Sequence, residues 1–152
     1  MSNWRTILLS DLTAAAASGK VGIIQAAATA RGLPDPAAAA ITMVTQELRA
    51  TIGFSGKYAV DQVSTSIPSG LLDLAIKKIV REMTRAVQMG LTPDEQADEK
   101  TYESRLDKIR MGQWPIDLPD TPIVTGQVTV GPSAQLLSSQ RRRFKTGEQR
   151  GL

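Results

Sequence analysis

The chain of 152 residues contains no cysteine and no histidine. These two absences exclude disulfides, thiolate nucleophiles, typical zinc sites and the commonest general base. A serine nucleophile would lack a histidine to activate it, and the glycines around Lys20 do not have the spacing of a phosphate-binding loop. The sequence therefore predicts that the protein is not an enzyme and has no catalytic residue, cofactor site or metal site.

Aromatic residues and long apolar runs are also scarce. The chain has two tryptophans, two tyrosines and two phenylalanines, so its core must be built mainly from aliphatic side chains and alanine. Alanine-rich helices bury little area each, and contact with copies of the same chain would add burial. No apolar run approaches the ~20 residues of a membrane span. Asp11 interrupts the apolar amino-terminal stretch, so we expect neither a membrane helix nor a signal peptide.

Apolar periodicity and capping residues predict an all-α body over residues 1–112, a small bundle of four to five helices. The expected helices cover residues 10–17, 21–30, 36–52, 69–89 and 93–111, and residues 53–68 are expected to form a long loop. The clearest start signal is Thr92, followed by Pro93 at the first helical position and by Glu95 three residues after the cap. Gly53 and Gly112 are expected to end their helices.

Two groups of charged residues lie on the predicted helices. Lys77, Arg81 and Arg85 follow one another at a spacing of four, which suggests a basic stripe that faces DNA in a channel or a neighbouring subunit. We favour the alternative that these residues form a solvated face or pair with acids of the last helix. The acidic residues of segment 94–99 suit the positive end of the last helix dipole, and we favour that interpretation over a divalent-cation site.

The character of the sequence changes after Gly112. Three prolines follow within ten residues, which excludes a regular helix. Residues 123–131 then alternate valine with polar residues, as in a strand or hairpin that needs an edge from another chain. Residues 138–152 carry five lysines and arginines against one glutamate, a net +4, whereas residues 1–137 sum to −1.

We therefore predict a second part, residues 113–152, which is an extended docking arm that contains a short strand or hairpin and ends in a basic tail. Large aromatic residues and arginines are the residues that carry most interface energy. The candidate partner-binding residues of the arm are Trp114, Ile123, Val124, Val128, Val130, Arg141, Arg142, Arg143, Phe144 and Arg150.

Taken in order, these segments resemble the head–tail connector, or adaptor, proteins of tailed bacteriophages, especially those of Mu-like phages. Residues 67–75, IPSGLLDLA, resemble the entry to the family's central helix, x-I-P-x-x-L-x-x-A, with the alanine, Ala75, one position later than in that pattern. Residues 102–112, YESRLDKIRMG, resemble its closing helix, Y-E-x-x-L-x-x-I-x-x-G. The terminal Arg143-Phe144 and Arg150-Gly151-Leu152 resemble the R-x-F … G-F/L end of Mu-type members. The resemblance covers nearly the whole chain, and the alanine-rich first third matches only in pattern.

The resemblance implies a structural virion protein at the head–tail junction, or neck, made in the cytoplasm of the bacterial host. Such a protein would form a dodecameric ring below the portal protein, extend the channel through which packaged DNA passes, and join the capsid to the tail. Its partners would be the portal protein, a tail-side connector or tail terminator protein, and neighbouring copies of itself, with no membrane. A ring of this kind is heterologous, so each subunit presents two different faces to its neighbours.

Two other functions use the same residues. A small helical DNA-binding or DNA-packaging protein would use the basic stripe and the tail for phosphate contacts, and the near-neutral body argues against it. An unrelated helical interaction module would carry the tail as a solubilising end.

Overall fold

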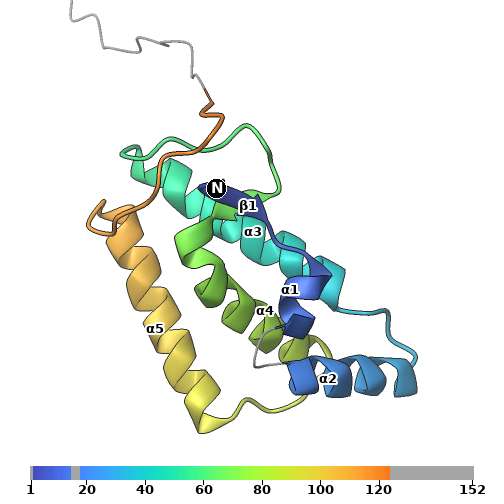
Figure 1. The fold of residues 1–152 in the computed structure, drawn as a ribbon. Coiled ribbons are helices and arrows are strands. Elements are labelled where there is room, and N and C mark those ends of the chain that lie inside the picture. Colours follow the sequence, from blue (N-terminus) through green and yellow to red (C-terminus); the bar gives the residue numbers. More distant parts are fainter. Residues whose placement is uncertain (1, 15–17, 124–152) are drawn as a thin grey trace, which may run out of the picture.

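A computed structural model describes residues 2–14 and 18–123 of the chain, and this part forms a mostly helical body (Figure 1). It contains five α-helices and one two-stranded sheet. The helices are α1 (Leu9–Ala14), α2 (Ser18–Ala30), α3 (Ala37–Ser55), α4 (Leu72–Ala86) and α5 (Pro93–Arg110). The strands are β1 (Trp4–Thr6) and β2 (Ser66–Pro68). The expectation of a helical body is therefore confirmed, while residues 124–152 of the expected arm lie outside the described residues.

The core is mainly aliphatic, as the scarcity of aromatic residues predicts. Helix α4 lies at its centre and packs against α1, α2, α3 and α5 (Figure 1). The longer outer helices α3 and α5 each turn one apolar stripe toward it. These stripes consist of Val44, Leu48 and Ile52 on α3 and of Tyr102, Leu106 and Ile109 on α5. Full burial of a large apolar side chain contributes about 1.5 to 3 kcal/mol, so these stripes fix how the helices pack.

Several helix boundaries differ from those expected from the sequence. Helix α3 continues through Gly53, the predicted break, and ends at Ser55. A single glycine inside a helix costs only about 1 kcal/mol, and burial of Ile52 just before it outweighs that cost. The residue that ends the helix is Gly56, whose φ of 64° is left-handed. Helix α4 is preceded by a 3₁₀ turn, Ser69–Leu71, and ends at Ala86 rather than near Met89.

A small antiparallel sheet joins two segments that the sequence suggested were extended or looped. Strand β1 pairs with β2 in the register Trp4 to Pro68, Arg5 to Ile67 and Thr6 to Ser66. Trp4 and Ile67 are fully or almost fully buried, so the sheet ties the amino terminus to the entry of α4. Strands of three residues are too short to show alternation, which is why the sequence does not reveal them.

The amino-terminal cap of α5 matches its prediction. The Thr92 side chain accepts a hydrogen bond from Glu95 N, and the Glu95 carboxylate accepts one from Thr92 N at 2.8 Å. Together they form a capping box. Gly112, with a φ of 68°, follows the helix at its other end, where the sequence predicts a stop.

Replacing Thr92 with alanine is expected to lower the free energy of unfolding by about 1 kcal/mol, because a capped backbone N–H loses its acceptor. Urea denaturation followed by circular dichroism measures this loss. Thr101→Ala is the matched control, since Thr101 is exposed in the middle of α5 and its hydroxyl donates only to Ala97 O. An equal loss in both variants would show that the capping box adds nothing.

Candidate docking site

Residues 113–123, which begin the predicted arm, lie against the body in an extended conformation. We call this segment the strap. In Figure 1 it runs, in orange, from the end of α5 toward the amino-terminal strand. Trp4 Nε1 donates to Asp117 O at 2.9 Å, and the Tyr58 hydroxyl donates to Trp114 O at 2.5 Å. The strap therefore joins β1, the loop after α3 and the end of α5, which are far apart in the sequence.

The end of the strap is held by the buried carboxylate of Asp61. This carboxylate accepts hydrogen bonds from Ser66 Oγ at 2.7 Å, from Thr121 Oγ1 at 2.5 Å and from Thr121 N at 3.2 Å. Asp61 is 4% exposed. Burial alone would raise the pKa of Asp61, but the hydrogen bonds from Ser66 and Thr121 outweigh it and lower that pKa. The charged form is thus the one that holds the strap.

Backbone pairing extends this attachment on both sides of Asp61. Gln62 N donates to Thr121 O and Ile123 N donates to Val60 O, each at 2.8 Å. Asp61 and Pro122 accordingly form an isolated antiparallel bridge. The pairing shows that the chain stays on the body as far as Ile123.

A second carboxylate fixes the strap to the amino terminus. Asp120 Oδ2 accepts from Ser2 Oγ at 2.6 Å and from Asn3 N at 3.1 Å. The hydrogen bond from Ser2, together with those from the backbone amides of Trp4 and Asn3, lowers the pKa of Asp120. Hydrogen bonds therefore link residues 2–4 to residues 117–120.

Two of the predicted partner-binding residues of the arm lie in the strap. Trp114 is half-buried against the core, with the Arg105 guanidinium 5.3 Å from its ring centroid. Ile123 is 45% exposed at the point where the described chain ends. The other candidates, Val124, Val128, Val130, Arg141, Arg142, Arg143, Phe144 and Arg150, lie outside the described residues. The first eleven residues of the predicted arm, 113–123, thus contact the body.

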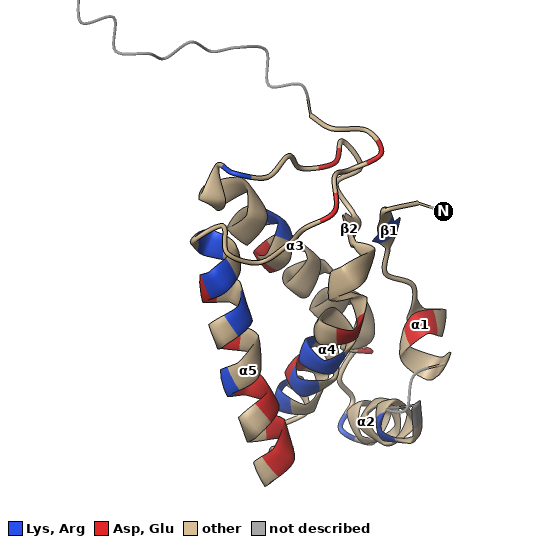
Figure 2. Cartoon of the chain, turned by 60° about the vertical axis from the view of Figure 1, so that its left-hand side comes forward, with Lys and Arg blue, Asp and Glu red and all other residues tan. Residues whose placement is uncertain are grey.

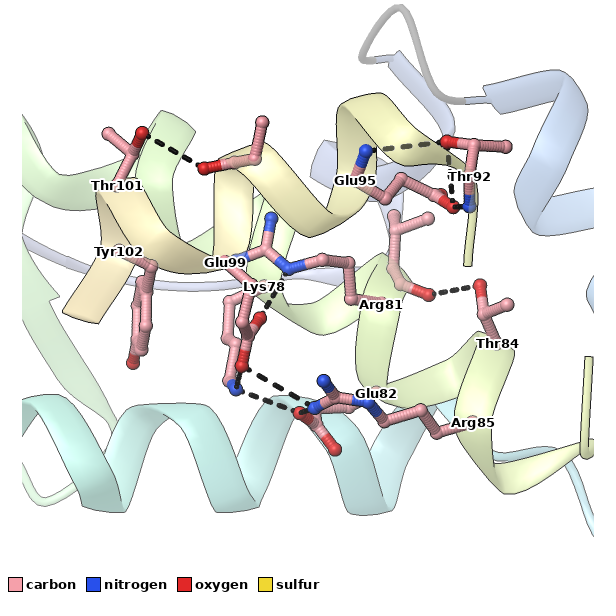
Figure 3. Close-up of polar contacts among 12 residues, drawn as sticks. Lys78, Arg81, Glu82, Thr84, Arg85, Thr92, Glu95, Glu99, Thr101 and Tyr102 are labelled. Atoms are coloured by element: carbon pink, nitrogen blue, oxygen red, sulfur yellow. Dashed lines mark hydrogen bonds and ion pairs between the residues drawn. The ribbon is translucent and has the colours of Figure 1, made fainter. Parts of the chain in front are cut away.

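A charged cluster between α4 and α5 contains two of the three residues of the predicted basic stripe (Figure 3). Glu99 of α5 is its centre. Its carboxylate accepts from Lys78 Nζ at 2.6 Å and from Arg81 Nε at 2.7 Å, and Arg85 Nη1 lies 3.4 Å away. Glu82 binds two of these cations, at 2.9 Å from Lys78 and 2.7 Å from Arg85. The cluster joins the two helices through five charged side chains.

In this cluster, the partners of opposite charge change the pKa values of Lys78 and Glu99 more than burial does. Desolvation alone would raise the pKa of Glu99 and lower that of Lys78. Hydrogen bonds between the opposite charges outweigh it, so the pKa of Glu99 is lowered and the pKa of Lys78 is raised. Beside them, burial and a 2.8 Å hydrogen bond to Glu47 raise the pKa of Tyr102. Lys78 and Glu99 therefore stay charged at neutral pH, and the cluster has the features of a structural ion-pair network.

The structure separates the three residues of the basic stripe. Lys77 is exposed and lies 3.7 Å from Asp73 on its own helix. Arg81 is 1% exposed and bound to Glu99. The Arg85 side chain is 45% exposed and bound to both glutamates. Pairing with the last helix, the alternative favoured for the stripe, thus describes Arg81 and Arg85.

Acidic clusters and long apolar helices were both sought in residues 2–14 and 18–123. That part of the chain has no cluster of three or more acidic side chains placed to hold a metal ion. None of its helices combines the length and apolarity needed to cross a bilayer.

No family model, curated protein or solved structure matches this chain. The strap and the charged cluster are therefore interpreted from their own contacts.

Sequence reasoning did not find Asp61, Asp120 or the central position of Glu99. Each acts through partners distant in the sequence, and Thr121, for example, is sixty positions from Asp61. Isolated aspartates in polar loops carry no local pattern that marks them. For Glu99, the favourable position in the first turns of α5 hid a second contact with α4.

Proposed function

We propose that this protein is a head–tail connector subunit of a tailed bacteriophage, which binds below the portal through the part of the chain that follows the strap. It would form a homo-oligomeric ring, extend the DNA channel and join capsid to tail at the neck of the virion. Tail-side connector or tail terminator proteins would bind its other side. The role is structural, with no reaction to catalyse.

The observation that carries the proposal is the burial of residues in the two segments, 67–75 and 102–112, that resemble the connector family. In the closing segment, Tyr102, Leu106 and Ile109 are at most 3% exposed, and Gly112 has the positive φ that ends the helix. In the entry segment, Ile67 is fully buried and Leu71 is 2% exposed, and Ile67 and Pro68 belong to β2. The positions that this chain shares with the family patterns are thus buried positions that determine how α4 and α5 pack. This supports a body with the same fold as in the family.

The strap gives the proposal a second support. It anchors residues 113–123 firmly, so the 29 residues after Ile123 are attached at a defined place on the body. Those residues hold a net charge of +4, while residues 1–123 sum to −1. A binding segment fixed to a rigid scaffold loses less entropy on docking than one attached through a free linker. Copies arranged in a ring would add avidity.

Deletion of residues 138–152 tests the docking role. The shortened chain should keep the helical circular dichroism and melting temperature of the full chain, because the described body ends at Ile123. It should no longer co-sediment with portal-bearing heads that lack their connector. Lys77→Ala in the full chain is the control for loss of one exposed charge on the body, and it should co-sediment normally. Co-sedimentation of the shortened chain at full-length levels would refute docking through the tail.

A DNA-binding measurement on the full chain distinguishes this proposal from the DNA-binding alternative. If the function were DNA binding, the full chain would bind duplex DNA with sub-micromolar affinity at moderate salt, and that affinity would fall steeply as salt rises. Arg81 and Arg85 are engaged by Glu82 and Glu99, so the body offers fewer cations to phosphates than the sequence suggests. We expect weak binding with a shallow salt dependence.

A further inference from the structure

A pocket of about 600 Å³ lies beside the first half of α3, and none of its lining residues belongs to the strap or the charged cluster. One wall is α3, and the other is formed by the end of β1 and by the loop before β2. Its apolar part consists of Ile7, Ala38 and Ile41. Its polar part consists of five serines and threonines, one glutamine and Arg49. Pockets of this size and mixed lining hold small organic molecules.

The lining of this pocket carries a positive charge and no negative one. Among the described residues that form it, Arg49 is the only charged one. Figure 2 shows the charges of the body gathered most densely on α4 and α5, while α3 is mostly tan, with Glu47 and Arg49 as its charged residues. Glu47 is engaged elsewhere, since its carboxylate accepts from the Tyr102 hydroxyl of α5 at 2.8 Å. The pocket is therefore suited to an anion.

The contacts of Arg49 leave its charge only partly balanced. Its Nη1 donates to Ser66 O at 2.8 Å, its Nη2 donates to Asp61 O at 2.7 Å, and the Trp4 ring lies 5.8 Å away. These three partners are uncharged groups. Burial lowers the pKa of Arg49, and the nearby charge of Asp61 opposes this shift without cancelling it. A guanidinium has more N–H groups than these two bonds use, so Arg49 keeps donors for a further acceptor.

Thr45 supplies a second donor in the pocket wall. It is 5% exposed, and its hydroxyl has no hydrogen-bond partner among the described residues. The other threonines of α3 differ, since Thr42 donates to Ala38 O at 3.0 Å and Thr51 donates to Glu47 O at 2.8 Å. A buried hydroxyl without a partner is unfavourable. Because threonine has two accessible χ1 rotamers on a helix, this covered hydroxyl can turn to an acceptor in the pocket.

We propose that this pocket binds a small organic carboxylate with an apolar chain. The carboxylate accepts hydrogen bonds from Arg49 and from the Thr45 hydroxyl, which turns about χ1 to meet it. The apolar chain lies on Ile7, Ala38 and Ile41. The inference goes beyond the connector function. Either can fail while the other stands, because the pocket shares no residue with the strap or the basic tail.

Nuclear magnetic resonance titration of the full chain with hexanoate tests this site. Binding should saturate with a Kd of about 1 mM, as expected for a ligand of so few atoms, and the amide shifts should concentrate at Thr6, Ile7 and Thr45. The charge is tested on the ligand, because substitution of Arg49 would also release the backbone of β2 and of the loop before it. Hexanamide, which lacks the charge, acetate, which lacks the chain, and inorganic phosphate should each bind about 10-fold more weakly or less.

Thr45→Val tests the second donor, since valine keeps the shape of the side chain and removes the hydroxyl. The variant should bind hexanoate about 5- to 10-fold more weakly, the usual effect of one lost hydrogen bond to a charged group. Thr51→Val is the matched control, because Thr51 is also 5% exposed on α3 and does not line the pocket. It should bind hexanoate as the native chain does. Circular dichroism checks that both variants fold.

Four results would overturn the proposal. Hexanoate could cause no saturable shift, its shifts could lie outside the pocket, or hexanamide, acetate or phosphate could bind as tightly as hexanoate. The fourth is a folded Thr45→Val with native affinity. The first three use the native chain, so they decide the question even where the variant does not fold.

Discussion

Replacing Glu99 with leucine should lower the free energy of unfolding by about 3 to 5 kcal/mol, the usual cost of removing one partner from a buried ion pair. The variant leaves Arg81, which is 1% exposed, without the carboxylate that its Nε binds at 2.7 Å. One terminal nitrogen of Arg81, Nη2, is already buried without a hydrogen-bond partner among the described residues. Lys78 would lose its 2.6 Å contact and keep only Glu82.

This loss would be large for a protein of this size. Small domains are stable by about 5 to 15 kcal/mol, so the variant could approach the limit at which the fold persists. Urea denaturation followed by circular dichroism measures the change. Glu103→Leu is the matched control, since Glu103 is exposed one turn further along α5. It should change stability by at most about 0.5 kcal/mol.

A compensating variant separates the lost pair from altered packing. Replacing Arg81 with methionine in the Glu99→Leu background removes the unpaired buried charge, and apolar groups of similar size often replace a buried pair without loss. The double variant should recover most of the stability. If Glu99→Leu were as stable as the native chain, or if the double variant were the less stable of the two, the cluster would not hold α4 against α5.

The same cluster shows how far the sequence predicts this fold. The capping box at Thr92 and the stop at Gly112 depend on residues a few positions apart, and the sequence predicts both. The spacing of Lys77, Arg81 and Arg85 leaves open which of them is solvated and which is paired, because a spacing of four drifts by about 40° per step around a helix. Helix α4 is also covered on several sides, so part of its polar face is buried. No sequence period shows which polar face a neighbouring helix will cover.

The strap was predicted as extended, and its attachment was not predicted. Three prolines exclude a helix but say nothing about which surface the segment lies on. Its anchors are single residues, Trp4, Asp61 and Asp120, whose partners lie between 60 and 118 positions away. Trp114, a candidate partner-binding residue, packs against the body beside Arg105. Local pattern distinguishes a helix from an extended segment, whereas long-range hydrogen bonds decide where that segment lies.

Replacing Asp61 with asparagine should release the strap and lower the free energy of unfolding by about 2 to 3 kcal/mol, the usual contribution of hydrogen bonds to a charged group in a buried site. Both tryptophans of the chain contact this region, Trp4 through Asp117 O and Trp114 through the Tyr58 hydroxyl. Tryptophan fluorescence therefore reports the strap, while circular dichroism reports the helices. The fluorescence transition should move to lower urea by more than the helical one.

The effect of this substitution should depend on pH in a defined direction. Because the pKa of Asp61 is lowered in the folded chain, the unfolded chain binds a proton at higher pH than the folded chain does. The contribution of the Asp61 charge to stability is complete above the pKa of the unfolded chain, about 4. It is lost as the pH falls through the lower pKa of the folded chain. The difference in stability between the native chain and Asp61→Asn should thus be greatest at neutral pH and shrink toward zero in acid.

A control within the strap tests whether this dependence belongs to Asp61. Asp117→Asn makes the same substitution at an exposed side chain of the strap, since Asp117 accepts from Trp4 through its backbone oxygen, which the substitution keeps. Its stability should follow that of the native chain at every pH. If the native chain and Asp61→Asn differed by the same amount at neutral and acid pH, the charge on Asp61 would not be what holds the strap. The loss at neutral pH would then come from altered packing around Ser66 and Thr121.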